Sequence, residues 1–208
     1  TLLLTSPYTA IILFIILIFS FFLSYLYFSI YAQYYLGVIF FLIVIYTPYL
    51  KGIPIIGNIA VSFIVASVFI FTELTLTKSF SYILFYPSIL TFLLTLIREI
   101  FKDIDDIEGD QKVGINTFPV RFGIHYSKYL LLFLIILLII VSFYPYWINI
   151  YNFNYLIFLV LFVQIPLVGC IFYLWKYPNS QSCGILTIAT KYITIGGVIT
   201  ILSTRLFA

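Results

Sequence analysis

The sequence predicts an all-α protein, a polytopic bundle of transmembrane helices. Hydrophobic residues make up 64% of the 208-residue chain and charged residues only 8%, whereas a soluble domain carries about a quarter charged residues. Apolar runs recur along the chain at about the 20 residues that a helix needs to cross a bilayer. These runs lack the alternation of apolar and polar residues that barrel strands show. A water-exposed domain and a membrane barrel are therefore excluded.

Seven apolar stretches are candidate membrane spans, and we expect them to form a single transmembrane domain over residues 1–208. The first is an uncharged run, and the second and third are short. Pro54 and Gly57 separate these two, because they would break one long helix. The fourth ends in a charged segment, the fifth in aromatic residues typical of a membrane interface, and the seventh contains Lys191. In chain order, the spans are 8–31, 34–49, 57–72, 81–101, 127–147, 155–175 and 185–206.

The positive charges predict an orientation. If the loop after the fourth span is cytoplasmic, the loops at Lys51 and Lys176 lie on the same side. That side then carries seven Lys and Arg residues and the opposite side two, as the positive-inside rule requires. We therefore expect an integral protein of the cell (inner, cytoplasmic) membrane with its acidic loop on the cytoplasmic side. The two groups are Lys51, Arg98, Lys102, Lys112, Arg121, Lys128 and Lys176 against Lys78 and Arg205.

Acidic residues cluster in one segment. Six of the seven lie between Glu99 and Asp110, although like charges this close repel and raise one another's pKa. Asp103, Asp106 and Asp110 stand at i, i+3 and i+7, which places them on one face of a helix, and Glu99 extends this stripe by one turn. Carboxylates at the mouth of a helix are suitable ligands for Mg²⁺, which bridges one or two carboxylates to substrate phosphates.

The basic residues around this segment favour a magnesium–diphosphate site. Arg98 and Lys102 flank the acids, and cations of this kind bind the outer oxygens of a diphosphate. His125 is the only histidine, which argues against zinc or copper. Cys170 and Cys183 predict neither a disulfide framework nor a zinc site. The alternative is a solvated loop in which acids and bases merely balance.

Two segments resemble the UbiA superfamily of intramembrane prenyltransferases. The second aspartate motif of that family is similar to REIFKDIDDIEGD at residues 98–110, with continuation to FPVRFG at 118–123. The family's Tyr…Lys segment between its fourth and fifth helices is similar to YTPYLKGIPIIGN at residues 46–58. Gly52 departs from the arginine that is commoner there. The resemblance covers nearly all of the chain.

The resemblance implies nine transmembrane helices and two aspartate motifs. The first motif, Asn-Asp-x-x-Asp-x-x-x-Asp, follows the second helix of the family and is absent from this sequence. The seven spans would then correspond to helices three to nine. We therefore expect the chain to lack the first two helices and half of the metal site, in agreement with its start at Thr1 and its lack of Met.

The activity that the resemblance implies is Mg²⁺-dependent transfer of a prenyl group from an allylic polyprenyl diphosphate to a lipophilic acceptor within the membrane lipid. Lys51, Tyr46 and Asn58 also have ordinary interpretations, as a loop lysine, a packing tyrosine and a helix cap. By resemblance, the metal-binding and catalytic residues are Asp103, Asp106 and Asp110, and the diphosphate- or prenyl-binding residues are Lys51, Arg98, Lys102, Tyr46 and Asn58.

The acceptor is predicted from the wording of the motif. The motif at residues 98–110 is most similar to that of geranylgeranylglycerol-phosphate geranylgeranyltransferases, which implies ether-lipid biosynthesis. Aromatic acceptors (4-hydroxybenzoate, homogentisate or a quinone) and a chlorophyll-type acceptor are alternatives. Neither a nucleic acid nor a protein partner is inferred.

Two interpretations from other classes stay open. The first is an inactive fragment, because half of the expected metal site is missing; we expect this chain alone to be inactive. The second is a cation-binding transport protein. Transport would require further polar groups deep in other spans, for which only Gln164 and Lys191 are candidates.

Overall fold

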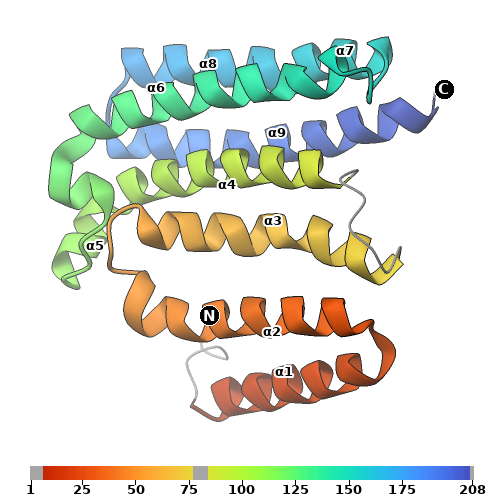
Figure 1. Cartoon of the computed structure of the whole chain (residues 1–208). Helices are drawn as coiled ribbons and strands as arrows, with labels where there is room; N and C mark the ends of the chain where they lie inside the picture. The colour runs from red at the N-terminus through yellow and green to blue at the C-terminus, as the bar shows by residue number, and fades with distance from the viewer. Residues whose placement is uncertain (1–6, 77–83, 207–208) are drawn as a thin grey trace.

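The computed structural model describes residues 7–76 and 84–206, and all regular structure in these ranges is helical. This confirms the predicted fold class. The longer helices run side by side as a bundle (Figure 1). The elements are α1 (Pro7–Tyr27), α2 (Ile30–Ile45), η2 (Tyr46–Leu50), α3 (Ile56–Leu76), α4 (Phe85–Asp105), α5 (Ile107–Lys112), α6 (Phe118–Trp147), α7 (Phe153–Leu159), η3 (Val160–Gln164), α8 (Ile165–Lys176) and α9 (Ser180–Leu206).

Each predicted span falls mainly on helical structure, but the first one, 8–31, extends beyond the end of α1 at Tyr27 into the start of α2 at Ile30. Five segments are long and apolar enough to cross a membrane: Ile30–Leu50, Ile56–Leu76, Phe118–Trp147, Phe153–Lys176 and Ser180–Thr204. The other two predicted spans fall on α1, whose apolar stretch Ile11–Leu23 is shorter, and on α4, which carries several charges near its end. Residues 81–83 of the fourth predicted span lie outside the described residues.

The expected break between the second and third spans is present, and two residues explain its form. Pro48 has no N–H to donate, so the helix widens there into the π-helical turn η2, in which the Lys51 N–H donates to the Tyr46 carbonyl over 2.9 Å. Gly57 opens α3 close to the preceding chain: a Cβ at this position would lie 2.9 Å from the Leu50 carbonyl oxygen. Only glycine allows this approach without a shift of the backbone.

Helix α4 lies at the centre of the bundle and packs against α3, α6 and α9 (Figure 1). Its apolar residues Ile97, Ile100, Phe101 and Ile104 are almost completely buried. The outer helices instead expose large apolar side chains, which in a bilayer face lipid. The end of α4 therefore has a fixed place in the molecule, beside the turn between η2 and α3, helix α5 and the start of α6 (Figure 1).

The two polar residues considered for a transport site have separate environments. Gln164 is buried and its Nε2 donates to Ser142 Oγ over 3.1 Å, while Tyr155 Oη donates to the Ser142 carbonyl over 2.8 Å. Lys191 lies exposed on α9. The amide of Gln164 is thus hydrogen-bonded inside the bundle, whereas Lys191 is at its surface.

The close approach at Gly57 predicts a stability effect. The Gly57→Ala change places a methyl group against backbone atoms that cannot rotate away, and we expect a loss of about 1–3 kcal/mol in unfolding free energy. Thermal unfolding of the protein in detergent measures it. Gly37→Ala is the matched control, because a Cβ at Gly37 meets nothing within 4 Å. Equal melting temperatures for the two variants would contradict the packing described for Gly57.

Candidate active site

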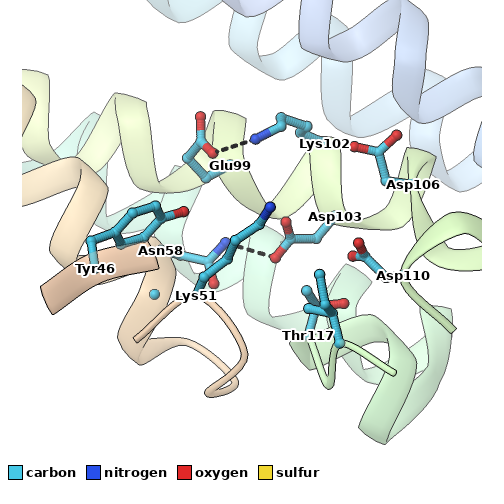
Figure 2. Close-up of a pocket in the computed structure, with 11 residues that line it drawn as sticks. Tyr46, Lys51, Asn58, Glu99, Lys102, Asp103, Asp106, Asp110 and Thr117 are labelled. Carbon is cyan, nitrogen blue, oxygen red and sulfur yellow. Dashed lines mark hydrogen bonds and ion pairs between the residues drawn. The ribbon is translucent and has the colours of Figure 1, made fainter. Parts of the chain in front are cut away.

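A polar pocket lies at one end of the bundle, between α3, α4 and the segments next to them. Figure 2 shows Tyr46 and Lys51 on one side of it, Asp106, Asp110 and Thr117 on the other, and Asp103 between them. The segment before α3 and the acidic segment after α4, far apart in the sequence, therefore meet here. The pocket is lined by Tyr46, Lys51, Gly57, Asn58, Glu99, Lys102, Asp103, Asp106, Asp110, Ile115 and Thr117.

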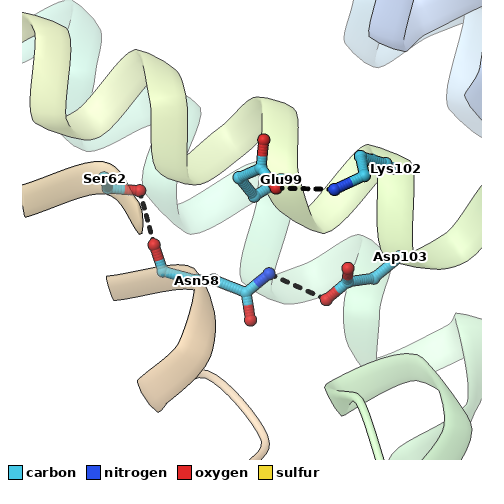
Figure 3. A network of polar contacts seen from close by, with 5 residues as sticks. All are labelled: Asn58, Ser62, Glu99, Lys102 and Asp103. Atoms are coloured by element: carbon cyan, nitrogen blue, oxygen red, sulfur yellow. Dashed lines mark hydrogen bonds and ion pairs between the residues drawn. The ribbon is translucent and has the colours of Figure 1, made fainter. Parts of the chain in front are cut away.

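A hydrogen bond between side chains joins the two helices at the pocket. Asn58 Nδ2, in the first turn of α3, donates to Asp103 Oδ2 over 2.7 Å (Figure 3). Ser62 Oγ donates to the Asn58 carbonyl over 2.7 Å. Asn58 is buried and lies inside α3, and its amide bonds to Asp103. The alternative interpretation of Asn58 as a helix cap is therefore wrong.

Beside this bond, Glu99 and Lys102 form an ion pair. Lys102 Nζ lies 3.0 Å from Glu99 Oε2 (Figure 3). Glu99 is 8% exposed, whereas about half of the Lys102 side chain is exposed. The pair keeps the ammonium of Lys102 at the edge of the pocket, where it can meet an anion.

The three aspartates do not stand on one continuous helix, and here the expected stripe is wrong. Helix α4 ends at Asp105, Asp106 has φ −88° and ψ 6°, and Asp110 belongs to α5. The interruption changes the direction of the chain between the first and third aspartates. All three still line the pocket. In the described ranges, however, no three His, Cys, Asp or Glu side chains come together closely enough to hold a metal ion.

The pocket nevertheless fits a magnesium ion that is shared with a ligand. The side-chain atoms of the pocket that could bind a metal ion are all oxygens. Mg²⁺ binds through one or two carboxylates, with waters and substrate phosphates at its other positions. Thr117 Oγ1 adds a buried oxygen that has no hydrogen-bond partner among the described residues. Three carboxylates in contact with one ion are thus not required.

Asp103 has an altered acidity. Burial raises its pKa to about 6, and the carboxylates of Asp110 and Glu99 act in the same direction, whereas the hydrogen bond from Asn58 and the charge of Lys102 oppose the rise. Because the folded state raises this pKa, Asp103 contributes less to stability as the pH rises through about 6. A cation bound above that pH would offset the cost of the buried charge.

Most of the predicted site residues thus gather at the pocket, with one exception. Arg98 does not line it; its Nε is buried and has no hydrogen-bond partner in the described part of the chain. Arg98 precedes Asp103 by five residues, which on a helix turns it well away from Asp103. The expected contact between Arg98 and diphosphate stays a prediction.

The pocket also contains residues that were not assigned to it from the sequence. The sequence places Glu99 in the acidic stripe but does not indicate it as a site residue. Thr117 could have been found from its position before Phe118 and Pro119, which is typical of a residue at a helix start. Gly57 and Ile115 carried no chemical signal, since the pocket uses their positions rather than functional groups.

The fold and the pocket define an integral membrane protein with an oxygen-rich, partly cationic site at one end of a helical bundle. The model of the UbiA prenyltransferase family matches residues 4–194. The chain therefore belongs to the UbiA prenyltransferase family, which confirms the resemblance seen in the sequence.

Its relatives include proteins with the name digeranylgeranylglyceryl phosphate synthase. The protein from Haloquadratum walsbyi is 32% identical over 68% of this chain and 48% of its own length. The protein from Methanosphaera stadtmanae is 33% identical over 78% of this chain and 57% of its own length. The chain thus spans about half the length of the curated relatives that it matches.

A solved structure supports the same assignment. It comes from work on digeranylgeranylglyceryl phosphate synthase in membranes and superimposes with a TM-score of 0.78 at 27% identity. The match covers 91% of this chain and 66% of the solved chain.

The Asn58–Asp103 bond predicts a measurable titration. In Asn58→Leu, the donor that favours the ionised form is lost, so we expect the pKa of Asp103 to rise above its present value of about 6. Infrared spectroscopy of the carboxylic acid band against pH follows it, with Asp103→Asn to assign the band. Thr72→Ala, which removes only a bond within α3, serves as the control. An unchanged titration in Asn58→Leu would show that the bond does not govern this carboxyl group.

Proposed function

We propose that the protein transfers a prenyl group from an allylic polyprenyl diphosphate to a lipophilic acceptor, with Mg²⁺ at the carboxylates. The observation that carries this proposal is the pocket itself. It brings the aspartate segment and the 46–58 segment, the two parts of the chain that resemble the family, to one place. Asp103, Asp106 and Asp110 supply anionic oxygens there, and Lys51 and Lys102 supply cations.

Some side chains of the pocket bind the substrate, and others orient the side chains that bind it. Lys51 and Lys102 bind the diphosphate oxygens, on which negative charge grows as the allylic C–O bond breaks. Asn58 orients Asp103 through its 2.7 Å hydrogen bond, and Glu99 orients Lys102. Mg²⁺, held by Asp103 with Asp106 or Asp110, would supply Lewis-acid stabilisation of the leaving diphosphate. The acceptor then forms a new bond to the allylic carbon and loses its proton.

The surroundings of the pocket suit a substrate with two chemically different ends. The charged head meets the carboxylates and lysines at the end of the bundle. The prenyl tail extends along apolar helix surfaces, which the structure exposes on the outer helices. Binding the tail in the membrane part keeps water away from the reactive allylic carbon.

We infer that the acceptor is geranylgeranylglyceryl phosphate and that the product is an ether lipid. The support comes from the relatives, which carry the name digeranylgeranylglyceryl phosphate synthase. We also propose that the pocket faces the cytoplasm, because Lys51, Lys102 and Lys112 lie at or next to it. On the opposite side, Lys78 and the side chain of Arg205 lie outside the described residues.

We propose that residues 1–208 act as one transmembrane domain. This domain contains one of the two aspartate motifs that the family resemblance implies. The expectations that other groups complete the metal site, and that this chain is inactive by itself, stay predictions.

The central test is loss of transfer after removal of single carboxylates. In the full-length protein, Asp103→Ala and Asp106→Ala should each lower the rate of prenyl transfer about 100-fold or more, as loss of one preorganised charge-stabilising group does. Transfer of a radiolabelled prenyl chain from geranylgeranyl diphosphate to geranylgeranylglyceryl phosphate measures it. Glu108→Ala controls for loss of charge, since Glu108 is an exposed acid of the same segment outside the pocket lining. Retained transfer in both aspartate variants would refute the site assignment.

A second test concerns substrate binding by Lys51. Removal of this ammonium in Lys51→Ala should raise the KM for the prenyl diphosphate about tenfold, because a hydrogen bond to a charged group is lost. The matched control is Lys112→Ala, an exposed lysine of α5 that does not line the pocket. If both lysine variants raised KM equally, the effect would be one of general surface charge.

A further inference from the structure

The last turn of α4 rests on the first turn of α9. Ser180 Oγ donates a hydrogen bond of 2.6 Å to the carbonyl oxygen of Asp105, the last residue of α4. Carbonyls at the end of a helix have no hydrogen-bond partner within that helix. The hydroxyl of Ser180, on another helix, donates to this carbonyl instead. The chain thereby ties two elements that are 75 residues apart.

The side chain of Asp105 contacts α9 one turn further along, at Gly184. A Cβ built on Gly184 would lie 2.9 Å from both carboxylate oxygens of Asp105. The carboxylate thus occupies the space that any larger residue at position 184 would need. Asp105 therefore contacts α9 in two ways, by the hydrogen bond to its backbone carbonyl and by the closeness of its exposed carboxylate to Gly184.

The turn that receives Asp105 is itself well ordered by local bonds. Asn179 Oδ1 accepts from the Ser182 N–H over 2.8 Å, as an N-cap does. Cys183, between Ser182 and Gly184, is completely buried. Its thiol lies near the carboxylate of Asp105, so we expect a weakened contact between Asp105 and α9 to increase the accessibility of this thiol.

Helix geometry connects this contact with the pocket. Two residues along an α-helix turn the side chain by about 200°, so Asp103 and Asp105 point to opposite sides of α4. On one side, Asn58 of α3 holds Asp103. On the other, Ser180 of α9 holds Asp105. The last turn of α4 is bonded from both sides just before Asp106, where the chain leaves the helix.

We propose that Asp105 is a positioning residue: its seat on Ser180 and Gly184 sets the rotation of the last turn of α4, so that Asp103 and Asp106 face the pocket. Asp105 itself does not line the pocket and touches no reacting group. The expected effect on Mg²⁺ binding and transfer rests on the proposed function. The contact between Asp105 and α9 does not depend on that function.

The first experiment tests the contact between Asp105 and α9 in the absence of prenyl transfer. In the full-length protein with Cys170→Ser as background, alkylation of Cys183 by a maleimide is followed with time. Gly184→Ala pushes the carboxylate away, and Ser180→Ala removes the hydrogen bond. Each should raise the alkylation rate about fivefold or more, the factor that corresponds to one lost hydrogen bond. Gly169→Ala, where a Cβ meets nothing within 4 Å, should leave the rate unchanged.

The second experiment separates positioning from loss of folding. Gly184→Ala and Ser180→Ala should each raise the Mg²⁺ concentration needed for half-maximal transfer several-fold more than they lower kcat. Ser180→Thr, which keeps the hydroxyl, should restore the value of the unmodified protein. Binding of Mn²⁺ in place of Mg²⁺, followed by electron paramagnetic resonance, should weaken in parallel.

The outcomes are distinct. If Cys183 reacts at the same rate in Gly184→Ala as in Gly169→Ala, or if Mn²⁺ binds to the Gly184→Ala and Ser180→Ala variants as it binds to the unmodified protein, the positioning role is wrong. If the unmodified protein binds Mn²⁺ and the variants lose it, but no prenyl transfer occurs, the proposed function fails while the positioning role holds.

Discussion

The hydrogen bond between Asn58 and Asp103 is the interaction on which the arrangement of the site depends. It is the point at which α3 meets the acidic end of α4, and it connects the two segments whose sequences resemble the family. A partly buried carboxylate is costly to ionise. The amide of Asn58 reduces that cost, while the hydroxyl of Ser62 holds the backbone that carries Asn58. The site is thus built from a short chain of polar contacts at the end of an otherwise apolar bundle.

The bundle provides the rigidity that these contacts need. Helix α4 is packed on three sides, and its buried residues Ile100, Phe101 and Ile104 alternate with the charged ones along the same turns. Apolar packing therefore determines the direction in which each charged side chain points. The polar ends of α3 and α9 then act on the last turn of α4, from opposite sides.

Much of this arrangement follows from the sequence, since long apolar runs in a chain with so few charges can form little else than membrane helices. The acidic cluster likewise predicts the location of the site, because its spacing and its basic neighbours are chemically unusual. The helix end at Asp105 could not be predicted in this way. A spacing of i, i+3 and i+7 is compatible with one helix, and nothing local in Asp106 requires a break.

Contacts between distant segments were equally invisible from local pattern. The bond between Asn58 and Asp103 and the seat of Asp105 beside Gly184 depend on which helices become neighbours. Arg98 is directed away from the pocket because of the rotation of α4 about its axis, which packing determines. Sequence reasoning identified the chemical groups well, but their pairing required the fold.

The interruption at Asp106 has a thermodynamic consequence for any ion that bridges Asp103 and Asp110. Asp103 belongs to a helix that is anchored in the bundle, whereas α5 contains no buried residue. An ion that joins the two must immobilise a short surface segment, and the lost conformational entropy lowers its net affinity. Release after the reaction is correspondingly easier than from a cage of preformed ligands. A site divided between the packed end of α4 and the exposed helix α5 would favour exchange of a bound ion over its retention.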